Sequence, residues 1–148
     1  QIKLGSMFEQ KEIEKTYRAV VHGIPSPEKG TVDMPVDGKP SVSNYNCIRQ
    51  SKSKRFGDLS VVDLQPLTGR THQLRKHMQL LGHPILGDKL YGTPDNILHA
   101  KGLFLCASRL KFVHPLSNKL LDISIDPPNK FDYYINREAK RYEMSISE

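Results

Sequence analysis

Hydrophobic and polar positions alternate along several short segments of the chain, which is the pattern expected of half-buried β-strands. A polar, basic turn at residues 50–55 separates two of these segments and predicts a hairpin. Residues 28–40 are rich in Gly, Pro and Asp, which favours a loop or a short edge strand. The predicted strands are residues 15–22, 42–49, 56–65, 104–113 and 120–125.

Two segments have the spacing of helices instead. Leu74, Met78 and Leu81 form an apolar stripe at i, i+4 and i+7, with Thr71 as the expected N-cap and Gly82 as the stop. Residues 131–141 form a second amphipathic segment after a Pro-Pro pair, and residues 1–14 are only mildly helical. Together, the predicted strands and helices indicate an α+β fold, with a mixed, largely antiparallel sheet and flanking helices.

Composition and charge narrow the function. The 148 residues fit one domain, and no apolar run approaches about 18 residues, which excludes a membrane-spanning helix. Cys47 and Cys106 lie apart without metal-ligand spacing, which indicates an intracellular, reducing compartment, cytoplasmic or organellar. A net charge of +6 favours a polyanionic partner. Residues 1–14 lack the features of a signal or transit peptide, so the chain is expected to begin within a longer protein.

The candidate chemistry is concentrated in residues 68–91. Several cationic or titratable side chains crowd the expected start of one helix, where the helix dipole disfavours positive charge. Such a helix start is suited to hold a phosphate or a carboxylate, and a solvated helix face is the alternative. These side chains are Arg70, His72, Arg75, Lys76 and His77.

Arg75 is next to Leu74, roughly 100 degrees further round the helix, and is expected at the border of the buried face. A half-buried arginine needs a partner, and a bidentate carboxylate would satisfy it and stay ionised. No nearby acidic residue is an obvious choice, because Asp88 lies in a Gly-flanked turn and is expected to cap local structure.

Other kinds of site find little support. His72 and His77 are spaced i, i+5 and have no acidic neighbour to complete a metal site. The chain has no Gly-x-Ser-x-Gly and no phosphate-cradling Gly-x-x-x-x-Gly-Lys loop. We therefore expect no metal, and the residues by themselves indicate only a basic α+β domain with a cationic helix start.

Four sequence segments indicate a more specific function, because together they resemble the RluA-type RNA pseudouridine synthases. The second and third blocks form one long and specific signature. The blocks are KTYRAVVHG at 15–23, TGRTHQLRKH at 68–77, LLGHPILGDKLYG at 80–92 and LFLCASRLKFVHP at 103–115.

The resemblance implies an enzyme that breaks the N1 glycosidic bond of a uridine in RNA, rotates the uracil and rejoins it through C5, without cofactor or metal. It implies that Tyr17 stacks on the base and removes the C5 proton. Arg75 would pair with the nucleophilic aspartate of the family. The implied partner is a structured RNA, tRNA or rRNA, and no membrane.

The chain departs from the family pattern in two places. The family's His-Arg-Leu-Asp block, which carries the nucleophile, occurs nowhere in the 148 residues, and Cys106 stands where relatives often have His. Residues 1–148 are therefore expected to be the C-terminal portion of a single catalytic domain, inactive alone, with the missing N-terminal half as a partner.

Five further residues are predicted to contact RNA. Arg70 and His72 are expected at the RNA backbone or the pocket, with capping or loop packing as the alternative. Lys52, Lys54 and Arg55 form a basic hairpin tip that could neutralise phosphates, with solvated loop charge as the alternative. Asp88 and Tyr91 are assigned to structure.

Two other hypotheses stay open at this point. The chain could be a non-catalytic RNA-binding module, in which case its RNA affinity would survive loss of the Tyr17 hydroxyl. It could instead be an inert stretch of a larger fold, with an exposed apolar face where the rest of the fold docks.

Overall fold

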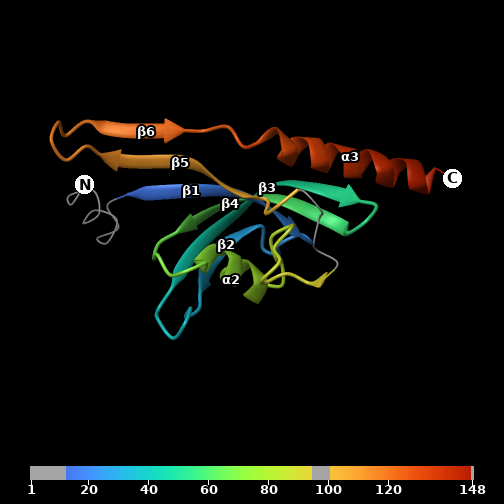
Figure 1. Cartoon of the computed structure of the whole chain (residues 1–148), viewed down its shortest axis with the longest axis horizontal. Coiled ribbons are helices and arrows are strands. Elements are labelled where there is room, and N and C mark those ends of the chain that lie inside the picture. The colour runs from blue at the N-terminus through green and yellow to red at the C-terminus, as the bar shows by residue number, and fades with distance from the viewer. Residues whose placement is uncertain (1–12, 95–100, 148) are drawn as a thin grey trace.

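A six-stranded antiparallel sheet, ordered β2-β3-β4-β1-β5-β6, is the centre of the computed structural model, which describes residues 13–94 and 101–147 (Figure 1). In this described part of the chain two helices flank the sheet, which confirms the predicted α+β class. The elements are β1 (Glu14–His22), β2 (Lys29–Asp33), β3 (Val42–Ser53), β4 (Gly57–Pro66), α2 (Gln73–Leu80), β5 (Leu105–Val113), β6 (Leu120–Ser124) and α3 (Asn129–Ile146).

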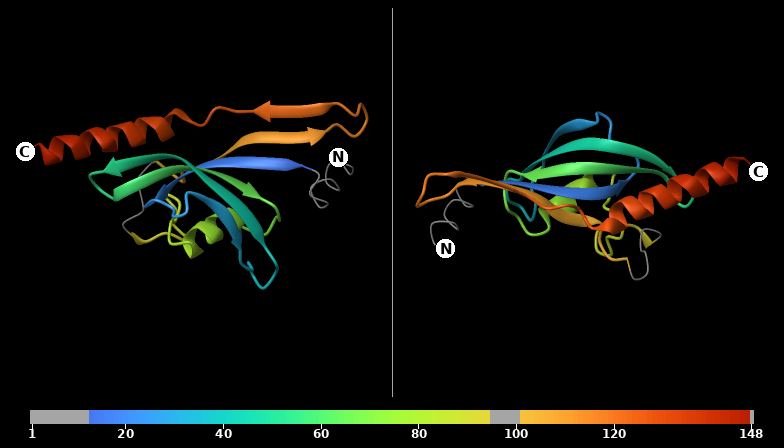
Figure 2. Two further views of the ribbon diagram at one scale, coloured as in Figure 1. Left: turned by 180° about the vertical axis from the view of Figure 1, so that it is seen from behind. Right: turned by 90° about the horizontal axis from the view of Figure 1, so that it is seen from above.

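The period-two pattern of the strands supplies a separate apolar core to each face of the sheet. On β1, Ala19 and Val21 point toward α2 and pack with Leu74 and Met78. Val20, which lies between them in the sequence, points to the opposite face, where α3 packs. Because successive side chains of a strand alternate faces, one short apolar run anchors both helices, and Figures 1 and 2 show α2 and α3 on opposite sides of the sheet.

The predicted elements are found, and their ends differ. Residues 28–40 do contain a short edge strand, β2. Strand β3 runs four residues further than predicted and β4 is shifted by one residue, so that only residues 54–56 form the turn. The final helix is also longer than predicted, from Asn129 to Ile146. Of the mildly helical segment 1–14, residues 1–12 lie outside the described part of the chain.

A buried carboxylate ties the β3–β4 turn to α3. Glu138 is 2% exposed, and its Oε1 accepts hydrogen bonds from the Ser53 hydroxyl at 2.6 Å and from the Arg55 backbone N–H at 3.0 Å. The Ser53 oxygen in turn accepts the backbone N–H of Phe56 at 3.1 Å. A buried carboxylate is stable only when its oxygens are hydrogen-bonded, so these contacts fix the turn against the helix.

The β5–β6 hairpin extends beyond the rest of the sheet and carries much of the exposed apolar surface (Figure 1). Among the described strands, β6 pairs only with β5 and forms one edge of the sheet. No helix in the described residues is long and apolar enough to cross a membrane. The exposed hydrophobic residues of the hairpin and the segment after it are Val113, Leu116, Leu120, Ile123 and Ile125.

We predict that Glu138→Ala lowers the free energy of unfolding by about 2 to 4 kcal/mol, because the Ser53 and Arg55 donors lose their buried acceptor. Glu143→Ala is the matched control, since Glu143 is exposed on the same helix, and it should change stability by less than about 0.5 kcal/mol. Urea unfolding followed by circular dichroism measures both. Equal stability of the two variants would contradict the anchoring role of Glu138.

Candidate active site

Gln73, and not Thr71, organises the start of α2. Its side-chain oxygen accepts hydrogen bonds from the Thr68 hydroxyl at 2.6 Å and the Arg70 backbone N–H at 3.1 Å, and its nitrogen donates to the Val42 carbonyl at 2.9 Å. The prediction that Thr71 caps the helix is therefore wrong, because the N-cap falls one residue later and the buried glutamine bonds the preceding loop.

The guanidinium of Arg75 is paired within the chain, with Asp88. Nε donates to Asp88 Oδ2 at 3.0 Å and Nη2 donates to Oδ1 at 2.8 Å. The side chain of Arg75 is 17% exposed and that of Asp88 is 0% exposed. The half-buried position and the bidentate carboxylate are as predicted, but the expectation that Asp88 would not be the partner is wrong.

A tight turn at Gly87 brings Asp88 onto α2. Gly87 has φ +82, and a Cβ at this position would lie 2.1 Å from the Gly102 carbonyl oxygen, so no other residue fits without movement. Asp88 Oδ1 also accepts the backbone N–H groups of Leu90 and Tyr91 at 3.0 and 2.9 Å. The expected capping role is thus present beside the ion pair.

The hydrogen bonds around Asp88 keep it ionised. Burial raises the pKa of its carboxyl, but the hydrogen bonds from Arg75 and from the Tyr91 and Leu90 N–H groups outweigh burial, so the pKa lies below its usual value. The pKa of Arg75 is raised by the same hydrogen bond. The pair is therefore charged throughout the physiological range.

Tyr91 covers the exposed side of this pair. The Arg75 Cζ lies 5.1 Å and the Lys76 Nζ 5.8 Å from the centre of its ring, which are cation–π distances. Its hydroxyl lies 2.8 Å from His72 Nδ1. His72 has φ 54, a left-handed conformation that costs roughly 1 kcal/mol in a residue other than glycine and is found at functional sites.

Tyr17 lies on β1, on the face of the sheet that α2 covers. It is partly buried and packs against the cluster that contains Leu74 and Met78. The pairing of β1 with β5 shifts register between Thr16 and Tyr17, and Ser108 donates its hydroxyl hydrogen to the Thr16 carbonyl at 3.1 Å there. Such a bulge re-aims side chains and is frequent beside active sites.

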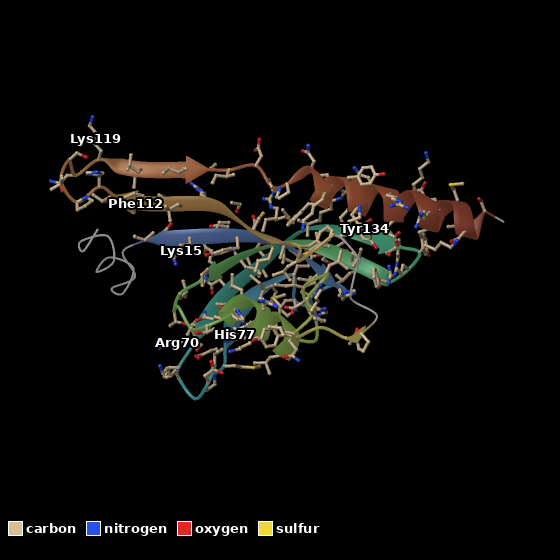
Figure 3. All side chains as sticks on the ribbon, in the orientation of Figure 1. Lys15, Arg70, His77, Phe112, Lys119 and Tyr134 are labelled. Carbon is tan, nitrogen blue, oxygen red and sulfur yellow. The ribbon has the colours of Figure 1, made fainter. Side chains whose placement is uncertain are left out.

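Arg70 and His77 both lie at or beside α2, where Figure 3 labels them. Arg70 donates Nε to the Pro40 carbonyl at 3.0 Å and lines a surface cavity together with Lys15. His77, predicted among the cations of the helix start, is instead fully buried, with ring nitrogens 2.7 Å from Ser43 Oγ and 2.8 Å from the Met34 carbonyl. His77 is therefore a core residue, and its burial is tolerated because both ring nitrogens have hydrogen-bond partners.

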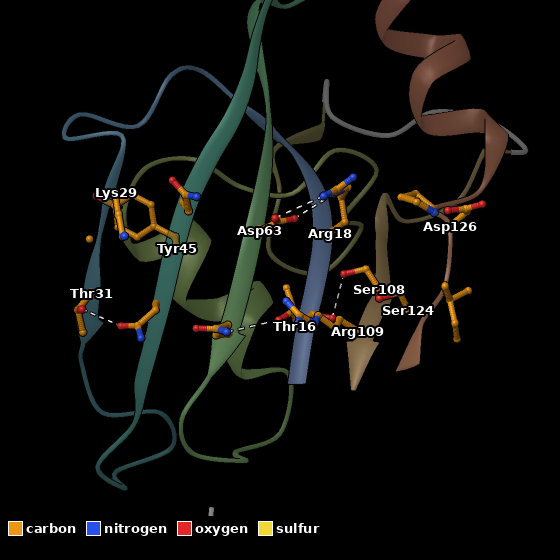
Figure 4. A pocket seen from close by; sticks show the side chains of 16 residues that line it. Thr16, Arg18, Lys29, Thr31, Tyr45, Asp63, Ser108, Arg109, Ser124 and Asp126 are labelled. Atoms are coloured by element: carbon orange, nitrogen blue, oxygen red, sulfur yellow. Dashed lines mark hydrogen bonds and ion pairs between the residues drawn. The ribbon is translucent and has the colours of Figure 1, made fainter. Parts of the chain in front are cut away.

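A polar groove of about 740 Å³ on the face of the sheet away from α2 was not predicted (Figure 4). Arg18 and Asp63 form an ion pair within it at 2.9 Å. Neither this groove nor the cavity beside Arg70 is lined by Tyr17 or Arg75. The groove is lined by the polar residues that alternate with apolar ones along the strands, so the sequence did contain a signal for it. Among these residues are Thr16, Arg18, Asn44, Asn46, Asp63 and Gln65.

Within residues 13–94 and 101–147, no group of three or more His, Cys, Asp or Glu side chains is placed to hold a metal ion. Both cysteines are free thiols. Burial raises the pKa of Cys106, and this outweighs the effect of the nearby Arg18 and Lys130 charges. The chemically notable features of this part of the chain are the Arg75–Asp88 ion pair, the adjacent Tyr91 and the polar groove.

Comparison with known proteins decides the family. Residues 2–80 match the RNA pseudouridylate synthase family. This chain is a member of that family. Within it the chain is of the RluA type, because curated RluA proteins align along most of its length.

Three relatives give the extent of the match. The dual-specificity RNA pseudouridine synthase RluA of Vibrio parahaemolyticus is 36% identical, over 82% of this chain and 55% of that protein. Its counterpart in Escherichia coli is 38% identical, over 76% and 57%. An uncharacterized RNA pseudouridine synthase of Chloroflexus aurantiacus is 36% identical, over 84% and 43%. The chain thus spans about half the length of these relatives.

Solved structures show the same fold. Human RNA Pseudouridylate Synthase Domain Containing 1 superposes with a TM-score of 0.71 at 26% identity, covering 84% of this chain and 58% of that chain. Human RNA Pseudouridylate Synthase Domain Containing 4 also gives 0.71, at 23% identity, with 92% and 66% covered. The strand order and flanking helices described above are therefore those of a pseudouridylate synthase domain.

We predict that Asp88→Asn lowers the free energy of unfolding at pH 7 by about 3 kcal/mol, because it leaves a mostly buried guanidinium without its charge partner. Asp37→Asn is the control, since it breaks the exposed pair that Lys76 makes on the same helix. Chemical denaturation at a series of pH values measures both.

The pH series tests the sign of the pKa shift. Because the pKa of Asp88 is lowered by folding, its stabilisation is complete above the unfolded value of about 4 and is lost as the pH falls through the folded value. The gap between wild type and Asp88→Asn should therefore narrow below about pH 4. A gap that is constant from neutral to strongly acidic pH would contradict an ionised, paired Asp88.

Proposed function

We propose that this chain supplies the tyrosine and the arginine of an RNA pseudouridine synthase that converts uridine to pseudouridine in a structured RNA, tRNA or rRNA. Membership of the family supports the reaction class. The reaction breaks the N1–C1′ bond, rotates the uracil and forms a C5–C1′ bond. The proton lost from C5 is balanced by one gained at N1, so the reaction is an isomerisation and consumes no co-reactant.

Arg75 holds the nucleophilic aspartate in this proposal, although it is already bound to Asp88. Asp88 takes one edge of the guanidinium, through Nε and one hydrogen of Nη2. An arginine has further N–H donors on its other edge, in a fixed planar arrangement. Asp88 therefore orients Arg75, and the free edge of Arg75 binds the second carboxylate and keeps it ionised for attack.

Tyr17 acts on the base. Its position on the α2 face, next to the apolar residues of that helix, gives the flipped uracil a ring to stack on and keeps water away from the reacting atoms. A tyrosine hydroxyl in such a place is able to move a proton at C5. The β1–β5 register shift beside it supports a functional position.

The nucleophilic carboxylate comes, in this proposal, from a His-Arg-Leu-Asp block that the 148 residues do not contain. The 148-residue chain alone is therefore expected to show no turnover. We place the remainder of the catalytic domain on the exposed apolar β5–β6 hairpin. A group of exposed apolar side chains of this size is typical of a surface that another part of the protein covers.

We predict that Tyr17→Phe in the full-length protein lowers the rate of pseudouridine formation by about 100-fold or more, with RNA affinity nearly unchanged, because the ring is kept and only the hydroxyl is removed. Tyr133→Phe, at an exposed tyrosine of α3, is the control and should be fully active. Single-turnover assays on RNA labelled at C5 of uridine measure release of the label.

Two outcomes would contradict the proposal. Full activity of Tyr17→Phe would remove Tyr17 from the chemistry. Failure of the intact full-length protein to convert any uridine, while it still binds RNA, would favour the alternative of a non-catalytic RNA-binding module.

A further inference from the structure

The hairpin–helix surface is formed by six cationic side chains from two segments that lie far apart in the sequence. Three come from the β3–β4 turn and its approach, and three from one face of α3, where positions i, i+3 and i+4 lie together. All six residues are exposed. They are Lys52, Lys54 and Arg55 from the hairpin, and Arg137, Lys140 and Arg141 from α3.

The two halves of this surface are held in a fixed relation. Glu138 lies on the buried side of α3 and binds the turn through the Ser53 hydroxyl and the Arg55 backbone N–H. Figures 1 and 2 show α3 running alongside the β3–β4 hairpin in all three views. The cations therefore form one preorganised surface, in contrast to a mobile loop next to a separate helix.

Electrostatics at Tyr134 supports this convergence. Burial and the neighbouring Glu138 raise the pKa of the Tyr134 hydroxyl, while the charges of Arg55, Arg137 and Arg141 all lower it. One hydroxyl thus senses guanidinium groups from both the hairpin and the helix. The three positive charges repel one another, and an added anion between them would relieve that repulsion.

Most of these cations lack an acidic partner. Lys52 pairs with Asp58 at 2.8 Å, and Arg141 lies 3.7 Å from the buried Glu138. Among the described residues, no carboxylate lies within ion-pair distance of the other four cations of the surface. Those four are Lys54, Arg55, Arg137 and Lys140.

The polar groove on the sheet differs from the hairpin–helix surface in its charge balance. Its two arginines are neutralised, because Arg18 pairs with Asp63 at 2.9 Å and Arg109 pairs with Asp122. It therefore has hydrogen-bonding capacity and little net positive charge. A polyanion is attracted by uncompensated charge, so the hairpin–helix surface is the better candidate for phosphates.

We propose that the hairpin–helix surface binds the phosphate backbone of the substrate RNA at a distance from the uridine that reacts, an inference that rests on the function proposed above. The surface lies on the α3 side of the sheet, whereas Tyr17 packs on the α2 side. It holds the body of a folded RNA by charge without reading its sequence. Arg55 and Arg137 contact neighbouring phosphates, and Glu138 is a positioning residue that acts through the turn.

The test compares two charge-matched variants of the full-length protein. Arg55→Gln with Arg137→Gln removes one cation from each half of the surface. Lys29→Gln with Lys39→Gln removes the same charge from exposed lysines elsewhere. The probe is a fluorescein-labelled RNA stem–loop, titrated by anisotropy over a range of salt concentrations, and thermal unfolding confirms that both variants are folded.

For the surface variant we expect RNA affinity at low salt to fall about tenfold. The slope of log affinity against log salt should fall by about two, because each of the two substituted arginines neutralises roughly one phosphate in the wild type. The lysine variant should bind like wild type. In steady-state pseudouridine assays the surface variant should raise KM and leave kcat unchanged, because these arginines bind the phosphates equally well in the ground and transition states.

The inference is overturned if the two variants lose affinity equally, which would show an effect of net charge alone, or if neither loses affinity. It is also overturned if the surface variant keeps its RNA affinity and loses binding to vesicles that contain phosphatidylserine, which would assign the surface to a membrane. If the protein binds RNA through this surface and forms no pseudouridine, the proposed function fails and the surface assignment stands.

Discussion

The buried ion pair between Arg75 and Asp88 is the constraint on which the rest of the site depends. A charge removed from water must be compensated, so the helix that carries Arg75 and the turn that carries Asp88 are stable only together. Gly87 makes that turn possible, since a side chain there would overlap the Gly102 carbonyl. The ring of Tyr91 then packs against the guanidinium of Arg75.

The two faces of the sheet carry the two candidate functional regions. One face presents Tyr17 next to α2, while α3 on the other face joins the β3–β4 turn through Glu138 to make the hairpin–helix surface. Both arrangements use a buried carboxylate to fix an arginine-bearing segment. In one the carboxylate holds the guanidinium itself, and in the other it holds the backbone N–H of Arg55. Both orienting carboxylates, Asp88 and Glu138, are buried.

The strands and the apolar stripe of α2 were predictable, because they follow from periods of two and of about 3.6 residues that the chain displays locally. The partner of Arg75 was not, since it depends on how the turn at Gly87 folds back over the helix. The burial of His77 likewise depends on acceptors from Met34 and Ser43, which are remote in sequence. The burial of Glu138 depends in the same way on donors from Ser53 and Arg55, which are remote in sequence.

The most direct test of the account is the single-turnover rate of pseudouridine formation by full-length Asp88→Asn under conditions where the protein is folded. If Asp88 orients Arg75 toward the nucleophile, the rate should fall about 100-fold while RNA affinity is kept, because a small misplacement of a catalytic group has a large effect on the barrier. Asp37→Asn should retain the wild-type rate. A folded Asp88→Asn protein with the wild-type rate would show that the Arg75–Asp88 pair stabilises the fold and has no part in the chemistry.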